Sequence, residues 1–179
     1  MKEVIFVTGN QKKADYFSEL IGHEIPHHKA DIDEIQSLSL RTVVEHKLDQ
    51  AYAQIKRPVL VDDVSLEFKA MGRLPGTLIK WFQDEMSHEQ ICRLLDGQDR
   101  SAVARTVLGY YDGKEKTYFE GRLNGTVPDK PSGNDGFGWD PIFIPEGYSV
   151  TRAELSKEDD LKTYKTLKAI DELSSFLSS

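Results

Sequence analysis

The chain has 179 residues, of which 39% are apolar, and a formal net charge of −7 at pH 7. This length suits one domain, or one domain with a small lobe, and is long enough to bury a core without a disulfide or metal staple. A binder of duplex nucleic acid normally carries a basic face, so the net negative charge argues against that class of partner.

The sequence also argues against a membrane or secreted protein. The longest apolar run near the N-terminus covers residues 4–7, too short for a signal-peptide core or a membrane span. The single cysteine, Cys92, cannot form an internal disulfide, which fits a reducing compartment. We therefore expect a cytoplasmic protein with neither a nucleic-acid nor a membrane partner, in which Cys92 is a packing residue and not a nucleophile.

The first half of the chain alternates strand and helix signals. The apolar run 4–7 predicts a buried strand, and residues 14–21 then show the apolar spacing of a helix, which Gly22 ends. A second helix is expected after Ser37 or Ser39, with apolar positions at helical spacing over 44–55. A second buried strand, 59–61, is expected to end at a pair of aspartates.

The second half adds a hairpin and a long final helix. In chain order we expect a short helix at 78–82, a capping box at 87–90, two strands at 102–111 and 116–122 joined by an Asp-Gly turn, a glycine-rich loop at 133–138 and a last helix over 164–177. This order predicts an α/β fold with a mixed, twisted sheet and flanking helices.

The segment 8–13 is a candidate phosphate site. Gly9 lets the chain turn from strand to helix, so that backbone N–H groups at the helix start can face an anion. Lys12 and Lys13 lie in the first helical turn, where the helix dipole disfavours cations unless an anion is bound. Two solvated lysines on a surface helix are the alternative.

Carboxylates provide a candidate Mg2+ site. Asp62 and Asp63 follow an apolar strand, at the strand end where open α/β sheets place their ligands. Mg2+ prefers carboxylate oxygens and needs only one or two of them besides phosphate oxygens and water. Glu34 can supply another ligand, whereas an ordinary turn and a solvated acidic loop are the alternatives.

Two further groups are ambiguous by themselves. Lys47 lies on or beside the apolar face of the second helix, so its ammonium either extends to the helix edge or projects into a site. In the loop 136–141, Phe137 and Trp139 offer rings on which a base could stack, and a tight turn with core aromatics is the alternative.

Together these segments resemble the inosine triphosphate pyrophosphatase family. The resemblance rests on 6–13, 59–63, 74–82, 136–143 and 153–156, in the family's order and over nearly the whole chain. It implies an elongated α/β domain over 1–179, with two lobes flanking a central cleft, and commonly a homodimer. It also implies Mg2+-dependent hydrolysis of nucleoside triphosphates to monophosphate and diphosphate, with ITP, dITP and XTP as substrates.

The resemblance assigns roles to individual residues. Those expected to hold the triphosphate are Thr8, Asn10, Lys13 and Lys47. Those expected to bind the metal are Glu34 and Asp63, with Asp62 beside them, and Asp63 or a close neighbour is expected to orient the attacking water. Those expected to border the base are Phe137, Trp139 and Asp140.

The chain departs from the family at the residues that read the base. Members usually carry Lys-Asn-x-x-Ser-His-Arg near the last helix, where this chain has Asp160 in place of the lysine and 164–166 in place of Ser-His-Arg. The glycine that usually follows the two aspartates closely is also absent. Lys165 is expected to substitute at the base, with Lys162 as the alternative.

Three functions therefore stay open from the sequence. The first is pyrophosphate release from inosine or xanthosine triphosphates, and the second is the same reaction on another or a relaxed set of bases. The third is a nucleotide-binding module without turnover, against which the complete set of carboxylates and lysines argues.

Overall fold

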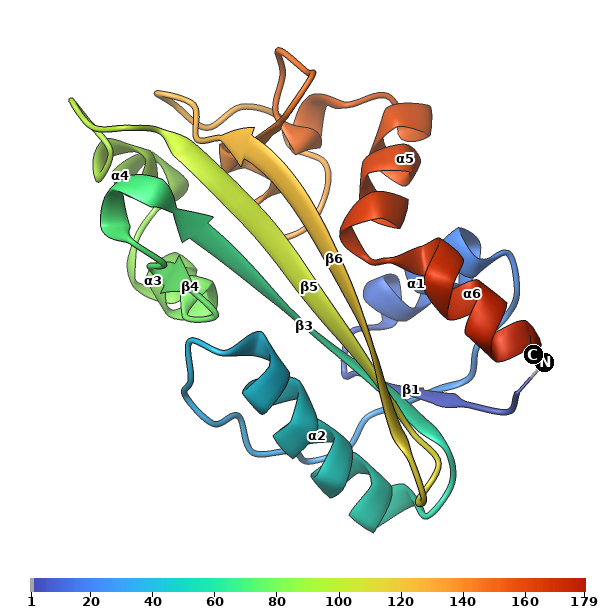
Figure 1. Cartoon of the computed structure of the whole chain (residues 1–179). Coiled ribbons are helices and arrows are strands. Elements are labelled where there is room, and N and C mark those ends of the chain that lie inside the picture. Colours follow the sequence, from blue (N-terminus) through green and yellow to red (C-terminus); the bar gives the residue numbers. More distant parts are fainter. Residues whose placement is uncertain (1) are drawn as a thin grey trace. The chain divides into compact units, whose positions relative to one another are not determined.

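Strands and helices alternate from the N-terminus up to β3 (Val59–Phe68), and the chain also contains short strands that the sequence pattern does not predict, at His27–His28, Pro75–Gly76 and Ile144–Pro145 (Figure 1). The computed structural model of the chain describes residues 2–179. The strands are β1 (Ile5–Val7), β2 (His27–His28), β3 (Val59–Phe68), β4 (Pro75–Gly76), β5 (Ser101–Tyr111), β6 (Lys116–Thr126) and β7 (Ile144–Pro145). The helices are α1 (Gln11–Ile21), α2 (Leu40–Ile55), α3 (Ile79–Glu85), α4 (His88–Arg93), α5 (Lys157–Leu167) and α6 (Ile170–Ser178), with short 3-10 helices at Lys69–Met71, Asp140–Ile142 and Arg152–Glu154.

The seven strands form one sheet in the order β2-β1-β3-β5-β6-β7, with β4 paired to β3. The pairs of β1 with β2 and with β3 are parallel, whereas β4 pairs with β3, and β7 with β6, in antiparallel fashion. The predicted mixed sheet is therefore confirmed.

The chain divides into two compact units. Unit 1 comprises Asp63 and the residues before it, Thr106–Gly121 and Lys165–Ser179, and unit 2 comprises Val64–Arg105 and Arg122–Tyr164. The strands β3, β5 and β6 contribute residues to both. The single domain, its elongated shape and its central cleft stay predictions.

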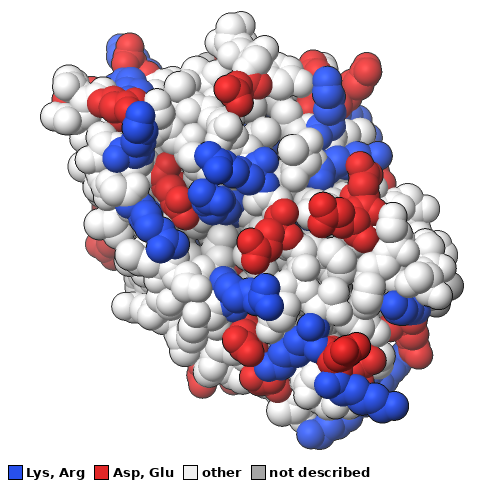
Figure 2. Space-filling view, in the orientation of Figure 1, with Lys and Arg blue, Asp and Glu red and all other residues white. Residues whose placement is uncertain are grey.

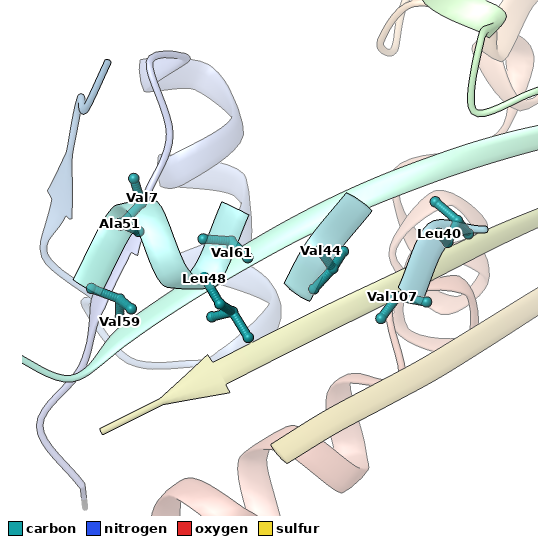
Figure 3. Close-up of a cluster of buried hydrophobic side chains, with 8 residues drawn as sticks. All are labelled: Val7, Leu40, Val44, Leu48, Ala51, Val59, Val61 and Val107. Atoms are coloured by element: carbon teal, nitrogen blue, oxygen red, sulfur yellow. The ribbon is translucent and has the colours of Figure 1, made fainter. Parts of the chain in front are cut away.

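In unit 1, α2 packs its apolar stripe on one face of the strands (Figure 3). The helix begins where the side chain of Ser39 accepts a hydrogen bond from the Thr42 N–H, which decides between the two predicted caps. Gly109 of β5 makes this contact possible, because a Cβ there would lie 2.6 Å from Val44 Cγ1. The cluster consists of Val7, Leu40, Val44, Leu48, Ala51, Val59, Val61 and Val107.

The other face of unit 1 packs against α1 and α6, which lie on the opposite side of the strands from α2 in Figure 1. The rings of Phe6 and Phe17 stack with centroids 4.6 Å apart, and Phe176 of α6 contacts both Tyr110 and Phe119. Successive side chains of a strand point to opposite faces. Neighbouring residues of β3 are therefore divided between the α2 face and the α1–α6 face.

Two predicted boundaries are wrong. The strand expected at 59–61 continues through Asp62 and Asp63 to Phe68, so the aspartates lie within a strand and not at its end. The single helix expected over 164–177 is two helices, because α5 ends at Leu167 and α6 begins at Ile170. Ala169 between them has a φ of 48°, a left-handed conformation that breaks the helical path.

Charged side chains of both signs are interspersed on the face drawn in Figure 2, and neither sign forms a continuous field there. Between residues 2 and 179, no helix combines the length and the apolar character that crossing a bilayer would require.

Cys92 lies in α4 of unit 2. This helix begins with the predicted capping box, which Ser87 and Gln90 form. The side chain is fully buried, and this burial raises the pKa of the thiol to about 11. With this raised pKa, only about one thiol in a thousand is ionised at about pH 8, and the ionised thiolate is the reactive form. We expect no labelling of the native chain by a water-soluble disulfide reagent at that pH, and complete labelling in denaturant. Rapid labelling of the native chain would contradict the packing role.

Candidate active site

Thr8 and Asn10, which are predicted to contact phosphate, lie in the turn between β1 and α1. The Asn10 side chain accepts a hydrogen bond from the Lys13 N–H at 3.1 Å and so caps α1. Thr8 Oγ1 in turn accepts from the Asn10 N–H at 3.2 Å. The two side chains thus explain why the helix begins here, and their contact with a phosphate stays a prediction.

A polar hollow of about 200 Å³ opens beside this turn, entirely within unit 1. Its wall combines the end of β1, the first turn of α1, the loop before α2, and the α2 lysine that the sequence singles out. The lining residues are Val7, Thr8, Gly9, Lys13, Ala30, Ile32, Glu34, Lys47, Val61 and Asp62. A helix start and several ammonium and carboxylate groups therefore meet at one hollow, which suits an anionic ligand that binds with a cation.

Lys47 joins the two carboxylates that are predicted to bind metal. Its Nζ lies 3.3 Å from Glu34 Oε1 and 3.1 Å from Asp63 Oδ2, and its side chain is only 15% exposed. Burial alone would lower the pKa of Lys47, but the carboxylates of Asp63 and Glu34 outweigh burial and raise it above the usual value. The ammonium therefore projects into the site, and the alternative of a lysine at the helix edge is not observed.

Asp62 has different partners from Asp63. Its Oδ1 lies 2.5 Å from Lys13 Nζ and its Oδ2 lies 2.6 Å from Lys168 Nζ. Burial alone would raise the pKa of Asp62, but the two ammonium groups, that of Lys13 first, hold it below the usual range. The two neighbouring aspartates thus have different ion-pair partners: Asp62 lies between Lys13 and Lys168, and Asp63 pairs with Lys47.

Glu34 and Asp63 carry the type of ligand atom that Mg2+ prefers, and the binding of Mg2+ stays a prediction. Glu34 and Asp63 converge on one ammonium nitrogen, and both present hard carboxylate oxygens. Among residues 2–179, no three His, Cys, Asp or Glu side chains come together as a metal-binding group. Two carboxylates are enough for Mg2+ when phosphate oxygens and water complete its coordination.

The residues predicted to border the base lie in unit 2. Phe137 is partly exposed, whereas the Trp139 ring is buried against Phe143, with centroids 5.5 Å apart. Asp140 is also buried, and its Oδ2 accepts a hydrogen bond from the Phe137 N–H at 2.7 Å. Asp140 therefore holds the loop in shape, and contact of these three residues with a base stays a prediction.

The sequence reasoning overlooked Arg152, whose side chain is completely buried in unit 2. Its guanidinium donates to Asp140 Oδ1 at 2.9 Å, Thr163 Oγ1 at 2.6 Å and Asp160 Oδ1 at 2.6 Å. It also lies over the Tyr164 ring, 3.9 Å from the centroid. Asp160 is therefore an ion-pair partner of Arg152.

Lys165, which was expected to substitute at the base, is exposed at the start of the last segment of unit 1. Its contact with a base stays a prediction. Lys168, three residues later, is buried instead and was not singled out by the sequence. Lys168 follows Tyr164 by four positions, which is the spacing expected within a single helix, so the sequence pattern does not mark it as unusual. In the structure it lies in the break between α5 and α6.

The chain matches the Ham1 family over residues 4–176. An inosine triphosphate pyrophosphatase from Batrachochytrium dendrobatidis is 40% identical over 182 residues, which cover 96% of this chain and 94% of the relative. An enzyme of the same name from Yarrowia lipolytica is 37% identical, covering 98% and 95%. The solved structure of a HAM1 protein from Coxiella burnetii has the same fold, with a TM-score of 0.82 at 24% identity over 99% of both chains. The chain belongs to the Ham1 family.

Proposed function

We propose that this chain is an Mg2+-dependent nucleoside triphosphate pyrophosphohydrolase that converts a triphosphate and water to the monophosphate and diphosphate. Its proposed substrates are ITP, dITP and XTP. Family membership and the two relatives named inosine triphosphate pyrophosphatase support this activity.

One observation carries the proposal furthest: the placement of Lys47 between Glu34 and Asp63 at the hollow that Lys13 also lines. A triphosphate carries several negative charges, which two ammonium groups and a divalent cation can offset. A binder of neutral ligands would have no use for so many charged side chains in one hollow, since each costs desolvation energy.

Glu34 and Asp63 would hold Mg2+, which when bound neutralises phosphate charge and polarises the phosphorus centre. Lys13 and Lys47 would hold the phosphates in place, with Thr8 and Asn10 at the start of α1. Asp63 would orient a water molecule toward the α phosphorus, because Asp62 already has an ammonium group on each of its oxygens. Positioning and charge neutralisation then provide most of the rate enhancement.

The side chains at the family's usual base-reading positions are replaced in this chain. The position of the family's usual lysine is taken by Asp160, and its carboxylate is paired with Arg152. A site that loses one hydrogen bond to a base loses about 1–3 kcal/mol of discrimination. The same reaction on a different or relaxed set of bases is therefore the second candidate.

A substrate panel tests the proposal. We expect diphosphate release from ITP, dITP and XTP with Mg2+, at kcat/KM at least about tenfold above that for ATP, GTP, CTP and UTP, and no release in EDTA. Metal-dependent release from other nucleotides would select the second candidate. No release from any nucleotide would refute the enzyme assignment and favour a binding module.

The resemblance also supports a homodimer, and the single buried cysteine suits a reducing cytoplasm. Both stay predictions, of which sedimentation analysis of the purified chain tests the first.

A further inference from the structure

Lys168 is a buried ammonium group that the proposed chemistry does not use. It occupies the two-residue break between α5 and α6, and only 7% of its side chain is exposed. Its Nζ contacts Asp62 Oδ2 at 2.6 Å, across 106 positions of sequence. A buried charge is costly unless it is paired and hydrogen-bonded: burial lowers the pKa of Lys168 below its usual value, and the contact with Asp62 opposes that shift.

The backbone around Lys168 is fixed from two sides. On one side Gly121 of β6 lies so close to the Leu167 carbonyl that a Cβ at Gly121 would collide with it. On the other side α6 is anchored by buried side chains at Ile170, Leu173 and Leu177. The left-handed Ala169 turns the chain between these anchors. The fold thus sets the Lys168 side chain in one place, opposite Asp62.

Lys168 reaches the lining of the hollow through its ion pair with Asp62. Asp62 and Lys13 line the hollow, whereas Lys168 is not among its lining residues. The carboxylate of Asp62 gives one oxygen to each lysine. Without Lys168, both oxygens of Asp62 would be available to Lys13, and the pair would be a neutral ion pair. With Lys168, two ammonium groups share one carboxylate, and a positive charge is left for an anion in the hollow.

We propose that Lys168 is a positioning residue for phosphate binding: it holds Asp62 so that Lys13 stays at the hollow with its positive charge available to a triphosphate. This inference rests on the proposed function for its substrate, but its electrostatic part concerns any polyphosphate.

The test compares Lys168→Met with the wild-type chain and with Lys157→Met, which removes an exposed lysine at the start of α5. The readouts are the affinity for inorganic tripolyphosphate by calorimetry, and kcat and KM for ITP. We expect Lys168→Met to weaken tripolyphosphate binding about tenfold and to raise KM by about the same factor, with kcat changed less than about threefold. A lysine that only stabilised the fold would lower the melting temperature without this split between KM and kcat.

Lys168→Gln provides a second variant, because it keeps amide N–H donors for Asp62 while removing the charge. If Lys168→Met does not fold, a similar loss of tripolyphosphate affinity in Lys168→Gln supports the inference. A folded Met or Gln variant with wild-type affinity and KM would overturn it. Wild-type chain that binds tripolyphosphate but hydrolyses no nucleotide would refute the proposed function alone, whereas wild-type chain that binds no tripolyphosphate would overturn the inference itself.

Discussion

Asp63→Asn is expected to abolish measurable diphosphate release, with a fall in kcat of about a thousandfold, while the chain stays folded. The substitution keeps the size of the side chain but removes the charge that faces Lys47 at 3.1 Å. It also removes one of the two carboxylates proposed to hold Mg2+, and the group proposed to orient water. The measurement is steady-state kinetics on ITP with Mg2+, together with the melting temperature.

Asp33→Asn is the matched control, because Asp33 is an exposed aspartate next to Glu34 and does not line the hollow. It is expected to keep kcat within about twofold, since exposed substitutions away from a site have small effects. Near-normal turnover by Asp63→Asn would refute the role given to Asp63 and redirect attention to Asp62.

The sequence contains part of the information that places Asp62 and Asp63 on opposite faces of the sheet. The expected strand ended with the apolar run at residue 61, yet Val64, Leu66 and Phe68 alternate with polar residues, which is the pattern of a strand that continues. Had the strand been extended, its period of two would have placed the two aspartates on opposite faces. Which lysine meets which aspartate depends on how the helices pack, and no local pattern contains that information.

The residues with local signals were easier to predict. Gly9, Lys13 and Lys47 stood out because each occupies an unusual place in its helix or turn, and the structure brings all three to one hollow. Lys168 had no such signal. No glycine or proline marks the break between α5 and α6, and at the break the Leu167 carbonyl lies against Gly121, 46 positions earlier in the sequence. Contacts between distant segments of this kind override local helical spacing.

Arg152 was overlooked for a related reason. An arginine in a sequence is read as a surface residue, because arginine is almost never fully buried unless it is paired. Its partners Asp140 and Asp160 lie 12 and 8 positions away, beyond the reach of helical spacing rules. In the sequence, Asp160 differs from the resembled pattern as a replacement of lysine, and its partner is not apparent there. The ion pair gives that replacement a physical reason, since an aspartate there neutralises the buried guanidinium.

The stability of unit 2 is expected to depend strongly on the buried ion pair between Arg152 and Asp140. Arg152→Met should lower the free energy of unfolding by about 3–5 kcal/mol, because it leaves the buried Asp140 carboxyl, whose pKa burial already raises, without its cation. Urea unfolding followed by tryptophan fluorescence measures the loss. Arg93→Met, which removes an exposed ion pair with Glu89, is the control and should cost less than about 1 kcal/mol.

A second substitution distinguishes an unpaired charge from lost packing. In Arg152→Met/Asp140→Asn the buried carboxylate is gone, so part of the lost stability should return, as expected when both members of a buried pair are replaced. If the double variant is as unstable as the sum of the two single variants, the guanidinium acts through its contacts with Thr163 and Tyr164 and not through Asp140. If Arg152→Met costs less than about 1 kcal/mol, the buried pair has no special part in the stability of unit 2.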